Sequence, residues 1–138
     1  MNPEFRPDRT DFETEQYSVS TKKNPVVLSA GTLTGDPVIN ETGEHLGNLE
    51  ELMLDLDSGR VAYAVISFGG IMGLGNKLFA VPWQALRVDT DRKAVVVNIA
   101  RDLLEQAPGF DKDNWPDTSE PTWLSGIFQY YGYEPYWA

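Results

Sequence analysis

Apolar positions between residues 25 and 99 form short runs that are separated by turn residues. Within residues 46–56, Leu52, Leu54 and Leu56 alternate with Met53 and Asp55, the two-residue period that predicts a β-strand with one buried face. The run 61–68 is apolar on both faces, which is typical of a central strand. Residues 57–60, Asp-Ser-Gly-Arg, lie between these two segments and predict a tight hairpin turn.

Further strands are expected at residues 37–39, 77–81, 87–89 and 94–99. Pro82 ends the second of these, because proline cannot donate a hydrogen bond to a neighbouring strand. Since the strands are short and closely spaced, the pattern predicts a mostly β fold, a small antiparallel barrel. The residues expected to be largely buried in it are Leu52, Leu54, Leu56, Tyr63, Val65, Val81 and Val97. Replacing Leu54 with alanine is then expected to cost about 2–5 kcal/mol.

Three parts follow from the change in composition along the chain. Residues 1–24 are polar and lack periodicity, which predicts a disordered arm. The barrel is expected over residues 25–99, and residues 100–138 form an acidic, aromatic-rich extension. Two short C-terminal helices are predicted there, one over residues 101–107 and one capped by Ser119.

The charge of the chain excludes several classes of partner. Eleven basic and 21 acidic residues give a net charge of −10, which argues against nucleic acid and against anionic membrane surfaces. No apolar run reaches the roughly 18 residues that span a bilayer, so no direct membrane insertion is expected. The polar N-terminus lacks the apolar stretch of a signal peptide, and no cysteine is present. A soluble, cytoplasmic protein is therefore expected.

The acidic residues are concentrated in one stretch. No lysine or arginine lies between Lys23 and Arg60, whereas seven carboxylates fall within residues 36–57. This stretch is either a solvated face that maintains solubility or a docking face for a basic partner.

Few residues offer catalytic or ligand-binding chemistry. His45 is the only histidine, so neither a histidine-based triad nor a site with several histidines can form. Residues 55–59 resemble the start of a calcium loop, but the glutamate required at its twelfth position is Ile66. The sequence therefore predicts no catalytic, metal or cofactor site and a protein that is not an enzyme.

One loop contains four glycines: Gly69, Gly70, Gly73 and Gly75. A phosphate-binding P-loop would need lysine at position 76, which is asparagine, and a dinucleotide loop would need glycine where Leu78 stands. We therefore interpret the glycines as a close-packed structural loop.

Aromatic residues are concentrated at the C-terminus, where eight of the sixteen lie in the last 24 residues. The candidate interaction surface consists of Trp123, Ile127, Tyr130, Tyr131, Tyr133, Tyr136 and Trp137. It could dock on its own barrel, on a second copy in a C2 dimer, or on another protein as a short motif. We favour the homodimer, because one small barrel has little surface to cover eight rings.

Several short segments together resemble a known family. They are residues 28–35 (Leu-Ser-Ala-Gly-Thr-Leu-Thr-Gly), 42–47 (Thr-Gly-Glu-His-Leu-Gly), 52–55 (Leu-Met-Leu-Asp), 58–63 (Ser-Gly-Arg-Val-Ala-Tyr), 68–70 (Phe-Gly-Gly) and 79–83 (Phe-Ala-Val-Pro-Trp). In combination they resemble the PRC-barrel domain of the photosynthetic reaction centre H subunit and of a ribosome maturation factor. The resemblance covers residues 26–99 and implies a small barrel used for protein contacts, with no common catalytic site.

The departures from those relatives narrow the resemblance. The transmembrane helix of H subunits and the extra N-terminal domain of the maturation factor are both missing here, so the chain resembles stand-alone PRC-barrel proteins. The leading hypothesis is a non-enzymatic interaction or assembly module with an unknown protein partner. The alternatives are an accessory factor of a membrane electron-transfer complex and an adaptor linked to ribosome assembly.

Overall fold

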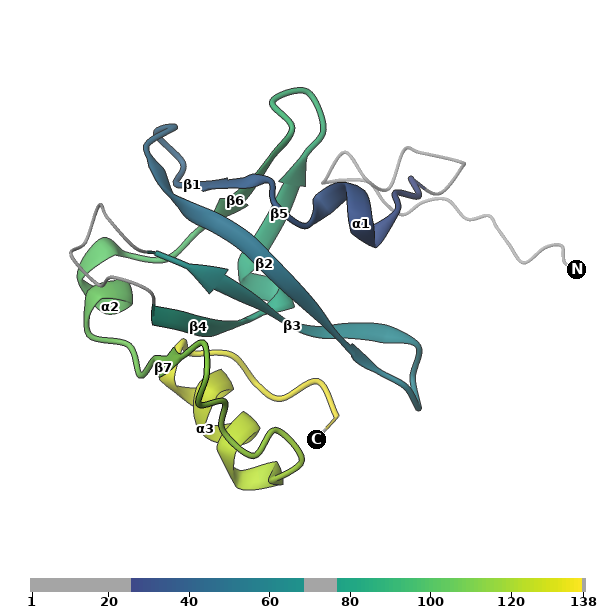
Figure 1. The fold of residues 1–138 in the computed structure, drawn as a ribbon, viewed down its shortest axis with the longest axis vertical. Coiled ribbons are helices and arrows are strands. Elements are labelled where there is room, and N and C mark those ends of the chain that lie inside the picture. Colours follow the sequence, from purple (N-terminus) through teal and green to yellow (C-terminus); the bar gives the residue numbers. More distant parts are fainter. Residues whose placement is uncertain (1–25, 69–76, 138) are drawn as a thin grey trace, which may run out of the picture.

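The computed structural model describes residues 26–68 and 77–137 (Figure 1). In chain order the elements are α1 (Ala30–Leu33), β1 (Pro37–Ile39), β2 (His45–Asp55), β3 (Arg60–Ser67), β4 (Lys77–Pro82), the 3-10 helix η2 (Trp83–Ala85), β5 (Leu86–Asp89), β6 (Ala94–Val97), α2 (Arg101–Glu105), β7 (Phe110–Asp111) and α3 (Pro121–Tyr130). The predicted mostly β fold with short C-terminal helices is confirmed.

The strands form one sheet in the order β5-β6-β1-β2-β3-β4-β7. Every neighbouring pair is antiparallel except β1 and β6, which run parallel, so the expectation of a purely antiparallel sheet is wrong at this pair. A long connection joins these two strands, and no hairpin constrains their relative direction. Among the described residues no strand pair joins β5 to the other end of the sheet. The closed barrel therefore stays a prediction.

Local sequence signals placed most element boundaries within a few residues. The β2–β3 turn lies where the Asp-Ser-Gly-Arg signal predicted it, and Gly59 has a positive φ of 73° there. The second C-terminal helix begins one residue later than expected. Its N-cap is Glu120, whose carboxylate accepts a hydrogen bond from the Thr122 amide, and Pro121 opens the helix. Helix α1, capped by Ser29, was not predicted.

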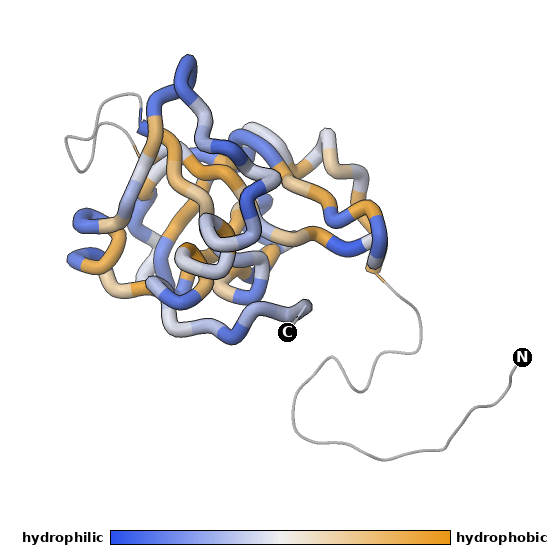
Figure 2. The backbone as a smooth tube through the Cα atoms, turned by 90° about the horizontal axis from the view of Figure 1, so that it is seen from below, coloured by the Kyte–Doolittle hydropathy of each residue, from blue (hydrophilic) through white to orange (hydrophobic). Residues whose placement is uncertain are grey.

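The core consists of the inner faces of the strands, and Figure 2 shows the hydrophobic stretches inside and the hydrophilic ones in the outer turns. Tyr63, Val65, Val81 and Val97 are buried, as predicted. Leu52 is half-buried. The same prediction is wrong for two leucines, because Leu54 is 61% and Leu56 is 88% exposed.

The β2–β3 hairpin is longer than the strands beside it, and this length leaves its leucines exposed. Pairing of β2 with β1 ends at Asn48, and pairing of β3 with β4 extends only to Tyr63. Beyond these points no strand of the described residues pairs with the hairpin, which extends away from the sheet (Figure 1). The alternation indicates the side of the strand on which Leu54 lies, but near the hairpin tip the described residues leave Leu54 largely exposed.

Replacing Leu54 with alanine is therefore expected to change the free energy of unfolding by less than about 0.5 kcal/mol. The matched change Leu49→Ala, at a fully buried position of the same strand, should lower it by about 2–5 kcal/mol. Urea unfolding of both variants measures the two values. Equal losses at the two positions would contradict the exposure of the hairpin tip.

Candidate functional site

The first candidates for a functional site are His45, the acidic side chains and the glycine loop that the sequence singled out. His45 is exposed at the start of β2, and no group of three or more acidic or histidine side chains in the described residues could hold a metal ion. Gly69, Gly70, Gly73 and Gly75, the proposed structural loop, lie outside the described residues. Of the helices in 26–68 and 77–137, none is long and apolar enough to cross a membrane.

The C-terminal segment, defined as residues 121–137, packs against its own sheet (Figure 1). Ile127, Phe128 and Tyr131 are buried, and the Trp123 ring meets the Tyr63 ring edge to face at 5.7 Å between centroids. This is one of the destinations that the sequence left open.

The outer aromatic residues of this segment contact several elements. The Tyr130 hydroxyl donates a hydrogen bond to the Leu103 carbonyl oxygen at 2.7 Å, which ties α3 to α2. Tyr133 is half-buried, and Trp137 is 42% exposed although its ring packs against Phe128. Of the candidate interaction surface, Trp137 thus remains the most accessible ring, while Ile127 and Tyr131 are covered by the chain itself. The homodimer stays a prediction.

A polar latch, formed by Tyr136, Asp55 and Arg60, fastens the end of this segment to the β2–β3 hairpin. The Tyr136 hydroxyl donates to the Asp55 carboxylate at 2.6 Å, and the Arg60 guanidinium lies 4.1 Å from the centroid of the Tyr136 ring. The hydrogen bond from Tyr136, with those from the following turn, lowers the pKa of Asp55. Burial, and then the neighbouring carboxylate, raise the pKa of Tyr136 to about 12.

Replacing Tyr136 with phenylalanine is expected to lower the free energy of unfolding at neutral pH. A depressed carboxyl pKa gives stability that is present above the unfolded value of about 3.9 and lost as the pH falls through the folded pKa. A raised phenol pKa gives stability that is lost as the pH rises from about 10 toward 12. The difference in the free energy of unfolding between the wild type and Tyr136→Phe should therefore become smaller at low and at high pH.

Tyr133→Phe is the matched control, because the described residues give its hydroxyl no hydrogen bond. Denaturant unfolding between pH 3 and 11, pH values chosen to bracket about 3.9 and 10, measures both variants. A pH-independent difference for Tyr136→Phe would contradict the latch.

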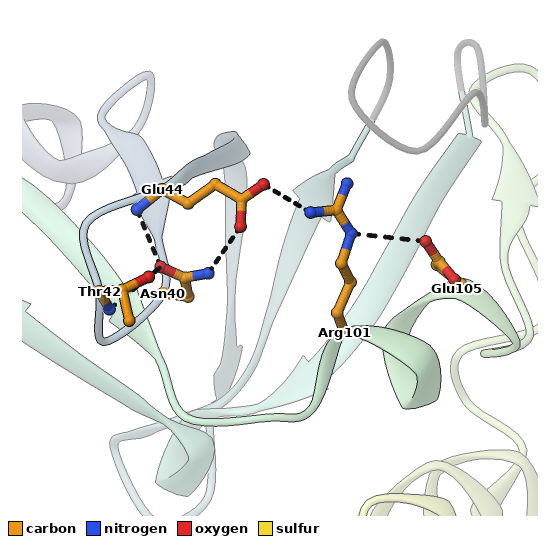
Figure 3. Close-up of polar contacts among 5 residues, drawn as sticks. All are labelled: Asn40, Thr42, Glu44, Arg101 and Glu105. Atoms are coloured by element: carbon orange, nitrogen blue, oxygen red, sulfur yellow. Dashed lines mark hydrogen bonds and ion pairs between the residues drawn. The ribbon is translucent and has the colours of Figure 1, made fainter.

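The acidic stretch 36–57 is not a uniform free face. Glu41 pairs with Arg87 at 3.4 Å, and Glu44 pairs with Arg101, which also contacts Glu105 (Figure 3). These ion pairs are exposed, so each contributes little to stability.

Asn40 holds the turn that presents Glu44. Its side-chain oxygen accepts hydrogen bonds from the Thr42 and Glu44 amides, and its amide nitrogen donates to Glu44 at 3.0 Å (Figure 3). The Glu44 carboxylate in turn raises the pKa of Arg101. This network joins α2 to the β1–β2 turn, which indicates a structural use for this part of the acidic stretch.

An apolar groove lies on the face of the β2–β3 hairpin that carries Leu54, opposite the face on which Asp55 binds Tyr136. Its larger cavity, about 470 Å³, is lined by Val26, Leu28, Ala30, Leu33, Leu52, Leu54, Val61, Trp83, Val88 and Thr90. A smaller cavity of about 250 Å³ shares Leu28, Leu33, Val88 and Thr90 with it, so the two adjoin. The walls are the segment from residue 26 through α1, the hairpin, η2 and β5.

Exposed hydrophobic residues gather around this groove. Of the seven large hydrophobic side chains exposed in the described residues, Val26, Val27, Leu28, Leu54 and Leu56 lie along its walls or on the hairpin tip beside it. Sequence reasoning missed the groove because it placed Leu54 and Leu56 in the core. The groove could have been inferred from strand lengths. The segment 46–56 is longer than the predicted strands beside it, so its end had to extend beyond them.

The chain is similar to proteins that are already known. The description "PRC-barrel domain" matches residues 25–104, more than half of the chain, and so extends into α2 beyond the predicted limit of residue 99. Among solved structures, the 16S ribosomal RNA processing protein RimM from Pseudomonas aeruginosa is similar, with 20% identity and a TM-score of 0.38. The match covers 54% of this chain and 45% of that protein, less than half of its length. No curated protein matches significantly. From the match over residues 25–104, the chain belongs to the PRC-barrel domain family.

Proposed function

We propose that this chain is a non-enzymatic protein–protein interaction or assembly module and that the apolar groove is its binding surface. The observation that carries the proposal is the concentration of five of the seven exposed large hydrophobic side chains along the groove and the hairpin tip. Isolated exposed hydrophobic residues are ordinary, but a contiguous exposed apolar surface is typical of an interaction site.

The chemistry of the groove also supports binding rather than catalysis. Among the described residues that line the larger cavity, Thr90 is the one polar residue and none has a titratable side chain. General acid–base catalysis needs a titratable group within hydrogen-bonding reach of the reacting atoms, and covalent catalysis needs an activated nucleophile. We place the module in the cytoplasm, since the lack of cysteine fits a reducing compartment.

Affinity purification from the native cell, followed by mass spectrometry, tests this function. We expect Leu54→Glu to lose the partner that the wild-type chain retains, because the change puts a carboxylate into an apolar wall without disturbing the core. Gln129→Glu is the matched control, since it adds the same charge at an exposed position of α3. Recovery of identical proteins by all three chains would contradict the groove as the binding surface.

The homodimer is tested separately by sedimentation of the same three chains. A wild-type dimer that Leu54→Glu converts to a monomer would assign the groove to self-association. A dimer that both variants retain would point to another surface, such as the exposed Trp137.

A further inference from the structure

Strand β5 forms one wall of the groove and is an edge strand of the sheet. It stands at one end of the sheet and pairs with β6 on one side only. Among the described residues no strand pairs with its other edge, toward which α1 lies (Figure 1). Backbone amide and carbonyl groups on a free edge are ready to pair with another extended chain.

The groove follows this edge. Val88 of β5 and Thr90, which follows the strand, line both cavities, while Leu28 and Leu33 line both from the opposite side. In an extended peptide, side chains two residues apart point the same way and lie roughly 7 Å from each other. Two adjoining cavities along one strand therefore suit two alternate side chains, the larger of which would lie near Trp83 and Leu54.

Charge distinguishes the possible occupants. Asp36 and Asp89 line the smaller cavity, and Asp57 lies in the hairpin turn beyond Leu54 at the other end. Among the described residues of this lining Lys93 is the one cation, and Arg92 pairs with Asp89, so the charges at the smaller cavity nearly cancel. A second copy would bring the same carboxylates and a net charge of −10 to the interface. A segment with lysine or arginine beside its apolar residues complements the net charge of −10 of this chain and Asp57 at the hairpin end.

We infer that the groove binds an extended segment of a partner protein, which adds as a strand to the free edge of β5. Apolar side chains at alternate positions of the segment occupy the two cavities, and basic residues flank them. This inference rests on the proposed interaction function and specifies the kind of partner. In this mode of recognition, backbone hydrogen bonds give affinity and the cavities give specificity.

Selection of peptides on the full-length chain tests the inference. The probes are peptides of about 12 residues from a random library, enough to span an edge strand with basic flanks. Peptides that also bind Thr90→Glu are discarded, because this exposed residue lines both cavities. We expect the selected peptides to have apolar residues at i and i+2 and a net positive charge. Gln129→Glu should bind them as the wild-type chain does.

Backbone methylation then distinguishes an added strand from a helix. Methylating the amides at one set of alternate positions should weaken binding about tenfold, measured by fluorescence anisotropy, because each of these amides loses a hydrogen bond. Methylation at the other set should change affinity by less than about twofold, because those amides face away from β5. Affinity should also fall as the salt concentration rises.

Four results would overturn the inference. Selected peptides with apolar residues at i and i+4 would indicate a helix in the groove. Tight binders without basic residues would contradict the role given to the negative charge of the chain. A wild-type dimer that the peptides dissociate would make a second copy the natural occupant. If no extended peptide binds but Leu54→Glu still loses its cellular partner, the proposed function stands and strand addition is wrong.

Discussion

Replacing Gly47 with alanine is expected to abolish folding. Gly47 is buried in β2, and a Cβ atom built on it would lie 1.6 Å from the backbone carbonyl oxygen of Ser67. Ser67 ends β3, which is paired with strands on both sides and cannot move away without breaking its ladders. The expected loss exceeds about 4 kcal/mol, a large part of the 5–15 kcal/mol that stabilises a typical domain.

Gly126→Ala is the matched control for this change. No atom lies within 4 Å of a Cβ at position 126, which is exposed on α3. Alanine there should raise the free energy of unfolding by roughly 0.5–1 kcal/mol, because glycine disfavours a helix. Circular dichroism and urea unfolding measure both variants. A folded Gly47→Ala chain of wild-type stability would mean that β2 and β3 approach each other less closely than described.

Truncation after Asp117 should also leave the chain unfolded or severely destabilised. The truncation removes Ile127, Phe128 and Tyr131, which belong to the buried interior, and it uncovers Tyr63. Loss of one large buried side chain costs about 2–5 kcal/mol, so the combined loss is comparable with the whole stability of the domain.

A single substitution separates this packing from the effect of shortening the chain. Phe128→Ala should cost about 3–5 kcal/mol, and Glu134→Ala, at an exposed position, less than about 0.5 kcal/mol. Denaturant unfolding measures all three proteins. A truncated chain as stable as the full one would show instead that residues 118–138 serve as a motif for another protein.

Properties that depend on neighbours in the sequence could be predicted here. The β2–β3 hairpin follows from leucine alternation and an Asp-Ser-Gly turn, and α3 follows from its proline and its apolar spacing. The parallel pairing of β1 with β6 depends on segments more than fifty residues apart, and no local signal specifies it.

The groove could not be predicted for a related reason. Alternation tells which side of a strand Leu54 faces, whereas its burial depends on whether another element covers that side. For the same reason the sequence did not show where the aromatic C-terminal segment packs. Its own sheet and the sheet of a second copy offer similar apolar surfaces. Only the structure shows that Trp123 packs against Tyr63 and that Tyr136 donates a hydrogen bond to Asp55.

The long hairpin makes contacts on both of its faces, and this connects the groove to the C-terminal segment. Leu54 lines the groove, whereas its neighbour Asp55 points to the opposite face and holds Tyr136. A ligand that orders the hairpin from one side therefore favours the attached state of the C-terminal segment on the other. Linkage makes this effect reciprocal, so attachment of the segment strengthens binding by the same factor. Slower amide exchange and slower proteolysis at Tyr136 would thus report occupancy of a site that Tyr136 does not touch.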